Sequence, residues 1–330
     1  MQKRGLKVLA SALMGLGCLV VGAGEAQAAK IGGWTYSIDS FNDGTGTILN
    51  SRNQHQGVVG SSSAYEFYGM AYKETSNRLI FAINSNLALG GETHHKSVEN
   101  GKISYGDLLL NFVNQNSLSA ANGSLYGVRF DDQNDTRKVQ YTETETYEVY
   151  NKKTKKMETK TRTVTKTRSD VGVYGNVTTT SVTSKNDGHK SVEAHTKSVS
   201  DLKGSASYGH LAADTTYFNQ KGAAQTTIAK GSLLGGVSLL SSSDLSAQHG
   251  LNFGQFGTQG AHTFGIAIDK SLLPKTGTFL ASLFAECGND GIVLKGEVQS
   301  VPEPTTVAGT LMAGAVLARR LKRRQKKATA

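Results

Sequence analysis

The chain has 330 residues and a formal net charge of +10, but this charge is concentrated at its two ends. Residues 1–28 carry a net charge of +2 and residues 301–330 carry +6, which leaves +2 for the part between them. The basic balance is therefore no sign of nucleic-acid binding. Cys18 lies in the first segment, so Cys287 is the single cysteine of the remainder. An intrachain disulfide is excluded there, and we expect Cys287 to be a small buried residue.

The first 28 residues have the pattern of a secretory signal peptide. A positive start precedes an apolar run, formed by Lys3, Arg4 and Lys7 and then by Val8–Ala23. Ala26 and Ala28 are small residues at the two positions that a signal peptidase reads. We therefore expect export of the chain and cleavage before Ala29, with signal peptidase as the first partner.

Residues 29–300 have the pattern of a protein made of many short β-strands. Short or alternating apolar runs are separated by clusters of Gly, Asn, Asp and Ser, which favour turns. No long stretch has helical spacing, and residues 181–246 are rich in Thr, Ser and Gly, which is typical of loops. We predict an all-β domain, an antiparallel β-sandwich or jelly roll. The expected strands are Trp34–Ile38, Tyr65–Tyr72, Arg78–Asn84, Ile103–Phe112, Leu125–Phe130, Val171–Val182, Ser232–Leu240, His262–Ile268, Thr278–Glu286 and Gly291–Val298.

Aromatic residues at strand positions are expected to fill the space between the two sheets. They are Tyr36, Phe67, Phe81, Phe130, Phe264 and Phe279. Such residues bury large apolar surfaces, so they indicate where the core lies.

A basic segment, residues 137–168, has the pattern of a long β-hairpin inserted into the domain. Two alternating arms rich in Thr flank a turn rich in Lys. The segment carries +6, which leaves −4 for the rest of residues 29–300. We expect acidic residues of the first arm to face basic residues of the second, namely Glu143, Glu145 and Glu148 facing Lys160, Arg162 and Lys166. The arm is either a contact for anionic extracellular polysaccharide or for a second copy, or simply a solvated ribbon.

Two loops carry closely spaced carboxylates. One contains Asp39 and Asp43, and the other contains Asp131, Asp132 and Asp135. Carboxylate oxygens at such spacing suit Ca²⁺, although neither loop has the spacing of an EF-hand. Because Asp is also an ordinary turn residue, both loops have a purely structural alternative. Ca²⁺ is thus a candidate cofactor at these five residues.

No catalytic motif accompanies these loops. The chain has no Gly-x-Ser-x-Gly elbow, no phosphate-binding loop and no His-Glu-x-x-His pair. His94 and His95 are adjacent, so in a strand they point to opposite faces and cannot chelate one ion. We expect a protein that is not an enzyme and that does not bind nucleic acid.

The last thirty residues have three parts in order. Pro302, Glu303 and Pro304 form a short motif, residues 305–318 form an uncharged run, and a basic block ends the chain. The basic block includes Arg319, Arg320, Lys322, Arg323 and Arg324. As a helix the run would span roughly 21 Å, which is short for a bilayer unless flanking basic side chains extend it. We expect a short membrane helix with its basic end on the cytoplasmic side.

This three-part tail closely resembles the PEP-CTERM sorting signal of bacterial proteins that an exosortase processes. The resemblance implies that the tail holds an exported precursor in the membrane and that exosortase cuts near Pro302-Glu303-Pro304. The body also resembles a group of cyanobacterial exosortase-dependent surface proteins. Relative to that group, residues 137–168 of this chain look like an insertion. The segments that carry this second resemblance are Gly33–Phe41, Tyr68–Lys73, Ala82–Asn86, Tyr105–Leu108, Tyr126–Phe130 and Phe284–Asp290.

The combined expectation is an exported protein of the cell surface or extracellular polysaccharide layer, with a structural or adhesive role. It would be anchored transiently in the inner membrane and then displayed or released. The alternative is a Ca²⁺-dependent carbohydrate-binding module, and a glycan-active enzyme comes third.

Overall fold

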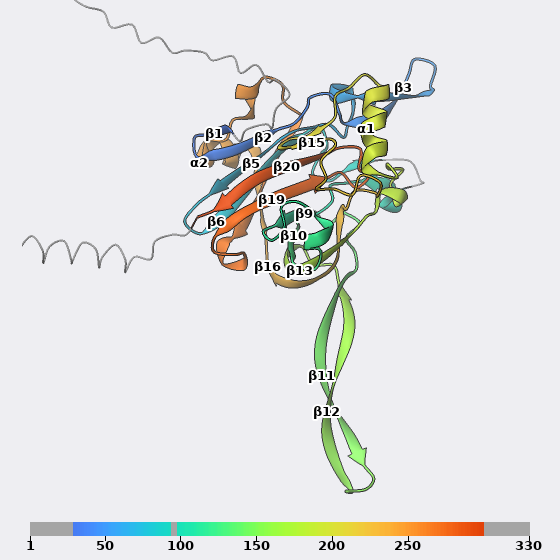
Figure 1. Cartoon of the computed structure of the whole chain (residues 1–330), viewed down its shortest axis with the longest axis vertical. Helices are drawn as coiled ribbons and strands as arrows, with labels where there is room; N and C mark the ends of the chain where they lie inside the picture. Colours follow the sequence, from blue (N-terminus) through green and yellow to red (C-terminus); the bar gives the residue numbers. More distant parts are fainter. Residues whose placement is uncertain (1–28, 94–97, 300–330) are drawn as a thin grey trace, which may run out of the picture.

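The computed structural model describes residues 29–93 and 98–299, which form a mostly β structure. Two large sheets make up the body, and one long hairpin projects from it (Figure 1). Neighbouring strands of these sheets are antiparallel, except for one short contact between β11 (Val139–Asn151) and β16 (Thr227–Gly235). The prediction of a mostly β fold with large antiparallel sheets is thus confirmed. The signal peptide over 1–28, His94 and His95, and the tail over 301–330 with its helix over 305–318 lie outside the described residues.

The elements are arranged as follows. From edge to edge, the six-stranded sheet contains β1 (Ala29–Ile31), β2 (Trp34–Ile38), β5 (Phe67–Glu74), β6 (Arg78–Ser85), β18 (His262–Asp269) and β17 (Ser238–Ser241). The eight-stranded sheet contains β12 (Lys156–Arg168), β11, β16, β13 (Gly172–Thr180), β10 (Leu125–Arg129), β9 (Leu108–Asn111), β19 (Gly277–Phe284) and β20 (Gly291–Val298). Smaller elements are the ribbons β3 (Thr45–Leu49) with β4 (His55–Val59), β7 (Glu92–Thr93) with β8 (Lys102–Ile103) and β14 (Ser207–Tyr208) with β15 (Leu211–Ala212), and the helices α1 (Val192–Asp201) and α2 (Ser242–His249).

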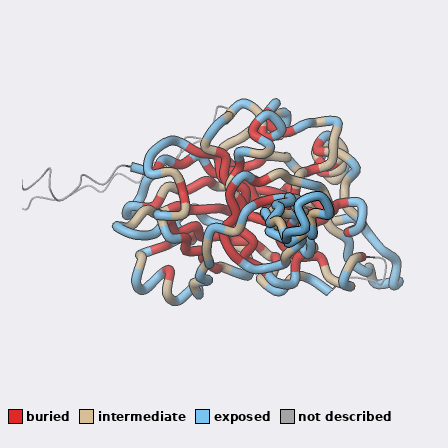
Figure 2. Tube along the Cα trace, turned by 90° about the horizontal axis from the view of Figure 1, so that it is seen from below, coloured by how far each residue is buried: buried red, intermediate tan, exposed pale blue. Residues whose placement is uncertain are grey.

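One hydrophobic core is shared by the two large sheets. Alternate residues of β6 and of β19 are buried in it, because successive side chains of a strand point to opposite faces. Phe81 of β6 and Phe279 of β19 meet there edge to face, with ring centroids 5.9 Å apart. Buried residues accordingly run through the middle of the body, and exposed ones surround it (Figure 2).

The outer faces of the sheets are also covered. On the six-stranded sheet, Trp34 and Ile80 pack with Leu245 of α2 and with Phe253. Tyr36 belongs to this outer cluster, so its predicted place between the sheets is wrong. The remaining predicted core aromatics lie in the shared core, and they are Phe67, Phe81, Phe130, Phe264 and Phe279. Cys287 lies in that core as well and is fully buried, as predicted.

The all-β prediction included no helix, whereas the structure has two short ones, α1 and α2. Helix α1 begins at a Ser191 N-cap, whose hydroxyl accepts a hydrogen bond from the Ala194 amide at 3.1 Å. Its buried residues Val192, His195 and Val199 are three and four positions apart and share one side of the helix. This buried face of α1 is short and includes a histidine, so it gives only a weak helical pattern. The Ser- and Thr-rich composition around it indicated a loop instead.

Two predicted strands are divided in the structure. The expected strand Ile103–Phe112 ends at Ile103 and resumes at Leu108. Between them the Asp107 amide bonds to Thr226 O at 2.8 Å, outside any sheet ladder. The expected strand Ser232–Leu240 is divided at the Gly235–Gly236 pair, so that β16 and β17 belong to different sheets.

The hairpin predicted over 137–168 is present as β11 and β12, which pair along 13 residues each. Glu145 lies opposite Arg162, as expected. Glu148, however, lies opposite Thr159, so its predicted basic partner is wrong. Lys166 instead bonds diagonally to Glu143 and Glu145.

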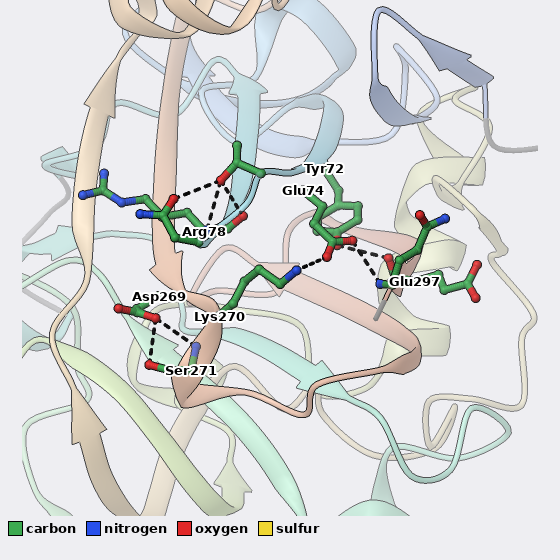
Figure 3. Close-up of polar contacts among 10 residues, drawn as sticks. Tyr72, Glu74, Arg78, Asp269, Lys270, Ser271 and Glu297 are labelled. Atoms are coloured by element: carbon green, nitrogen blue, oxygen red, sulfur yellow. Dashed lines mark hydrogen bonds and ion pairs between the residues drawn. The ribbon is translucent and has the colours of Figure 1, made fainter. Parts of the chain in front are cut away.

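Polar contacts tie the end of β20 to the six-stranded sheet (Figure 3). The Tyr72 hydroxyl donates to Glu297 O at 3.1 Å, and Glu74 Oε2 accepts from the Gln299 amide at 3.1 Å. Glu74 also forms an ion pair with Lys270. The described chain therefore ends in a strand that both sheets hold. Within residues 29–93 and 98–299, no helix has the length and apolar character needed to cross a membrane.

Candidate metal centre

Three aspartates from distant parts of the chain meet inside the body. Asp39 and Asp43 follow β2, whereas Asp290 lies in the turn between β19 and β20. One carboxylate oxygen from each lies within 4.8 Å of the others. Oxygens that bind one Ca²⁺ ion at roughly 2.3–2.6 Å are up to about 5 Å apart, so the spacing fits a shared ion. The exposed fraction is 6% for Asp39 and 0% for Asp43 and Asp290.

Backbone amides orient the first two carboxylates. Asp39 Oδ1 accepts from the amides of Ser40 at 3.0 Å and Gly209 at 2.9 Å, and from the Ser207 hydroxyl. Asp43 Oδ2 accepts from the Ser207 amide at 2.7 Å. Gly209 has a φ of +60°, which glycine adopts without strain. The turn around β14 thus fixes both aspartates from one side.

Asp290 is held in the same way. A fourth carboxylate, Glu66, is near enough to raise the pKa of Asp43 and of Asp290, but it is not one of the three whose oxygens lie within 4.8 Å of one another. Asp290 accepts from the amides of Phe67 and Gly291, both at 2.7 Å. Glu66 Oε2 accepts from the Gly44 amide at 2.6 Å. A Cβ atom on Gly44 would lie 2.4 Å from Glu66 Cα, so only glycine permits this close approach. Glu66 and Asp290 were not among the predicted ligands.

Three oxygens of this group are buried without any hydrogen-bond partner. They are Asp39 Oδ2, Asp43 Oδ1 and Glu66 Oε1. Each belongs to a carboxylate whose other oxygen is satisfied by a backbone amide. Buried polar atoms in native proteins are nearly always paired, so three orphaned oxygens in one cluster require a cation or bound protons.

Burial and mutual repulsion raise the pKa of every carboxyl in the cluster. Burial raises the pKa of Asp39 to about 7 and that of Glu66 to about 8. The pKa values of Asp43 and Asp290 are raised well above the ordinary range, first by burial and then by neighbouring carboxylates. A buried carboxyl that is not neutralised by a positive charge holds its proton, as these directions show.

No Lys or Arg among the described residues pairs with the cluster. None of the ion pairs of the described chain includes any of these four carboxylates. His195 is nearby, and its Nε2 donates to Asp43 O at 3.1 Å while its Nδ1 accepts from the Tyr208 hydroxyl at 3.2 Å. Burial and the neighbouring His189 lower the pKa of His195 to about 4, so it is neutral at pH 7.

A surface pocket of about 460 Å³ adjoins the cluster. Thr45 and Asn289 line it, and each is a near neighbour in sequence of a cluster aspartate. The Thr45 amide donates to Asn289 O at 2.9 Å, and the Thr45 hydroxyl lies 3.0 Å from His189 Nε2. None of the four carboxylates lines this pocket.

The second predicted loop is placed differently. Asp131 Oδ1 accepts from the Gln133 amide at 2.8 Å, an ordinary Asx turn. Asp132 is exposed, and Asp135 accepts from the side-chain amides of Asn100 at 2.7 Å and Asn186 at 2.9 Å. Asp131 Oδ2 is buried without a partner, but Asp131 belongs to no group of three or more potential metal ligands within the described residues.

The sequence therefore indicated two of the four carboxylates. A signal for Glu66 exists, since it is a charged residue inside the aromatic run Tyr65–Tyr68. For Asp290 the sequence indicated only a turn, because it follows Gly288 and Asn289. Comparison with known proteins yields no matching family model, no matching curated protein and no matching solved structure.

Proposed function

We propose that this chain is an exported cell-surface protein with a structural or adhesive role, whose β-sandwich body is stabilised by one buried Ca²⁺ ion. The ion would be bound by Asp39, Asp43 and Asp290, with Glu66 as a neighbouring carboxylate. The observation that carries the metal site is the set of orphaned, buried oxygens that belong to neighbouring carboxylates.

Calcium fits this donor set better than other common ions. All the candidate ligand atoms are carboxylate oxygens, which hard cations prefer and which soft metals do not. Mg²⁺ binds at about 2.0–2.1 Å and keeps several waters, which a fully buried set of side chains does not favour. Ca²⁺ accepts six to eight oxygens at longer distances, so it suits a dense group of carboxylates.

The ion would act as a structural link. It would join the loop after β2, the start of β5 and the turn between β19 and β20, and these segments belong to both large sheets. A link between residues more than 200 positions apart stabilises the folded state and leaves the unfolded chain unaffected. In a chain without an intrachain disulfide, such a link is valuable outside the cell.

The Ca²⁺ site is tested by calorimetric titration of the chelator-treated full chain with CaCl₂. We expect one saturable site, lost in Asp43→Asn and retained in Asp132→Asn. Asp132 is a matched control because it is an exposed aspartate of the second loop. Saturable binding that persists in Asp43→Asn and disappears in Asp132→Asn would move the site to the second loop and contradict the proposal.

Export and sorting are supported by the two ends of the sequence. The signal-peptide pattern ends at Ala26 and Ala28, and the tail carries Pro302-Glu303-Pro304 before its apolar run and basic block. Signal peptidase and exosortase are the proposed processing partners. Replacement of Glu303, or deletion of residues 319–327, should leave a membrane-retained precursor in the producing cell. Normal maturation of either variant would refute the sorting proposal.

The second candidate function is a Ca²⁺-dependent carbohydrate-binding module. The pocket beside Thr45 and Asn289 favours it, because a bound ion would order both of these lining residues through Asp43 and Asp290. The ion would then act indirectly, since the cluster itself is buried. Binding of a defined oligosaccharide that is lost both with chelator and in Asp43→Asn would favour this module over a purely structural role.

A further inference from the structure

The two faces of the projecting hairpin differ in composition. Residues of β11 and β12 alternate between faces, and directly opposite residues share a face. One face carries charged and aromatic residues, including Tyr141, Glu143, Glu145, Arg162 and Lys166. The other face, called the threonine face below, carries Thr142, Thr144, Thr146, Thr159, Thr161, Thr163, Thr165 and Thr167.

The charged face is closed by its own contacts. Arg162 lies 3.2 Å from Glu145 Oε2 and also stacks over the Tyr147 ring at 5.4 Å. Lys166 bonds to Glu143 and Glu145. Most of its side chains are half-buried as a result, although they belong to a ribbon far from the core. Apart from Lys160 and the turn residue Lys156, the basic residues of this face form ion pairs within the described chain.

The threonine face is exposed to solvent. All eight threonines are exposed, and three pairs lie directly opposite one another. Those pairs are Thr142 with Thr165, Thr144 with Thr163, and Thr146 with Thr161. Successive residues of one row are about 6.8 Å apart, and the two rows are about 5 Å apart. The result is a track of hydroxyl and methyl groups along the arm, and the exposed Glu148 interrupts it between Thr146 and Tyr150.

The tip of the arm is strongly basic. Lys152, Lys153, Lys155 and Lys156 are exposed within five residues, and none forms an ion pair in the parts of the chain that the structure describes. Tyr150 and Met157 lie opposite each other beside this turn, on the threonine face, and are 54% and 56% exposed. Four exposed lysines are thus gathered at one end of the threonine face, while Arg137 and Lys138 lie at the base of the arm and Lys160 lies on the charged face.

We propose that the threonine face and the lysine tip form a binding surface for a linear acidic polysaccharide. Carboxylate or sulfate groups of the polymer pair with the lysines, and sugar hydroxyls and ring faces contact the threonines and Tyr150. Threonine matches a sugar ring because both offer hydroxyl groups beside apolar CH groups. This inference rests on the proposed export, which brings the arm to an extracellular polymer.

Other polyanions fit this surface less well. Non-specific binding of single-stranded nucleic acid uses rows of aromatic platforms, whereas the exposed tip has one tyrosine. Stable binding to a lipid surface needs a larger apolar face than Tyr150 and Met157 provide. The threonine face bears one charged residue, Glu148, so it offers little charge complementarity to a second copy.

The test measures retention of the purified full chain on immobilised hyaluronan, a linear carboxylated polysaccharide, with neutral dextran as the blank. The tip variant replaces four lysines by glutamine, at Lys152, Lys153, Lys155 and Lys156. The control variant removes the same charge from exposed lysines of the body, at Lys30, Lys190, Lys275 and Lys295. We expect the tip variant to lose at least about tenfold in affinity and to show a shallower salt dependence, because fewer counterions are released. The control should bind like the unmodified chain.

A second variant tests the track itself. Replacing Thr142, Thr144, Thr161 and Thr163 by valine keeps the shape and the β-propensity of the strands but removes four hydroxyls. We expect a several-fold loss of affinity with an unchanged salt dependence. Chelator should leave retention unchanged, so failure of the Ca²⁺ proposal and failure of this inference are distinguishable.

Three outcomes would overturn the inference. Equal loss in the tip variant and the body control would show general charge attraction. Equal or tighter tip-dependent binding to single-stranded DNA or to vesicles containing phosphatidylserine would assign the surface to those polyanions. Tip-dependent dimerisation in sedimentation, without hyaluronan binding, would assign it to a second copy.

Discussion

The acidic cluster and the hairpin place carboxylates in opposite environments. In the cluster, Asp39, Asp43, Asp290 and Glu66 are buried, and the described chain provides no positive partner for them. On the hairpin, Glu143 and Glu145 are at the surface, and Lys166 and Arg162 bond to them. Charge pairs therefore form on the hairpin, where water would already stabilise the charges, and are missing from the described part of the cluster, where water is excluded.

The pKa directions follow this difference. Hydrogen bonds from Lys166 and Arg162 lower the pKa of Glu145, whereas burial raises that of Asp39 to about 7. An exposed ion pair contributes little to stability, because water screens it. An uncompensated buried carboxylate is costly, so whatever neutralises it has a large effect on folding. The free energy of unfolding should therefore depend on the solution conditions, namely calcium concentration and pH, through this cluster.

The largest expected effect is that of calcium on the unmodified chain. At 100 times the dissociation constant, a ligand that binds only the folded state adds about 2.7 kcal/mol to the free energy of unfolding. We therefore expect CaCl₂ to raise the melting temperature of the chelator-treated protein by about 5 °C or more. Differential scanning fluorimetry measures this shift, with Mg²⁺ at equal concentration as the control. Equal shifts with both ions would contradict a calcium-specific site.

The next largest effect is a pH dependence in the absence of calcium. The folded state holds protons that the unfolded chain releases, because the cluster carboxyls have raised pKa values, about 7 for Asp39 and about 8 for Glu66. Stability must then fall as pH rises from 6.5 to 8, by about 1.4 kcal/mol per pH unit for each extra proton bound. His195, with its pKa lowered to about 4, contributes only below pH 6.5.

Denaturant unfolding at several pH values, with chelator and with calcium, checks this dependence. Burial also raises the pKa of Glu286 to about 8, so part of the slope should persist in both conditions. The part due to the cluster is the difference between the two curves. Parallel curves would show that calcium does not bind to these carboxyls.

A smaller effect, with a change of sign, is expected for Asp43→Asn. Without calcium the variant should be more stable than the unmodified chain by about 1 kcal/mol at pH 8, because asparagine at this buried position needs neither a bound proton nor an unpaired charge. With saturating calcium it should be less stable, because it has lost a ligand. Chemical unfolding under both conditions measures the inversion, and Asp132→Asn should show no change in either.

The smallest effect is expected on the hairpin. Glu145→Gln breaks exposed contacts with Arg162 and Lys166. The melting temperature should change by no more than about 2 °C, and less at high salt, because exposed ion pairs are screened. A larger loss would mean that the arm packs against something that stabilises it.

Sequence reasoning located strands well where alternation was complete. Trp34–Ile38 and Gly291–Val298 have the predicted bounds, because each pairs along its whole length. It failed where backbone hydrogen bonds leave the ladder, as at Asp107, and where a glycine pair redirects the chain, as at Gly235. Neither event changes hydrophobic periodicity, so the pattern could not show it.

The metal centre was predictable only in part, for a similar reason. Asp39 and Asp43 are close in sequence, and their loop already indicated oxygen ligands. Asp290 reaches them through sheet topology alone, since its oxygen bonds to the amide of Phe67, 223 positions away. The second loop has similarly spaced aspartates, but they do not meet in a cluster. Asp135, for example, accepts hydrogen bonds from the side-chain amides of Asn100 and Asn186. Local composition identifies candidate ligands, but only the fold decides which of them meet.

The ties at the end of β20 have a mechanical consequence. If the tail holds the protein at a surface, any pull enters the body at Gln299. Such a load would peel β20 from β19 pair by pair, starting at Val298 opposite Gly277. The bonds from Tyr72 to Glu297 and from Gln299 to Glu74 pass the load to the other sheet before peeling begins. Lys270 also pairs with Glu74, so these contacts resist separation of the strands. Tension that would detach β20 alone is therefore distributed over both sheets.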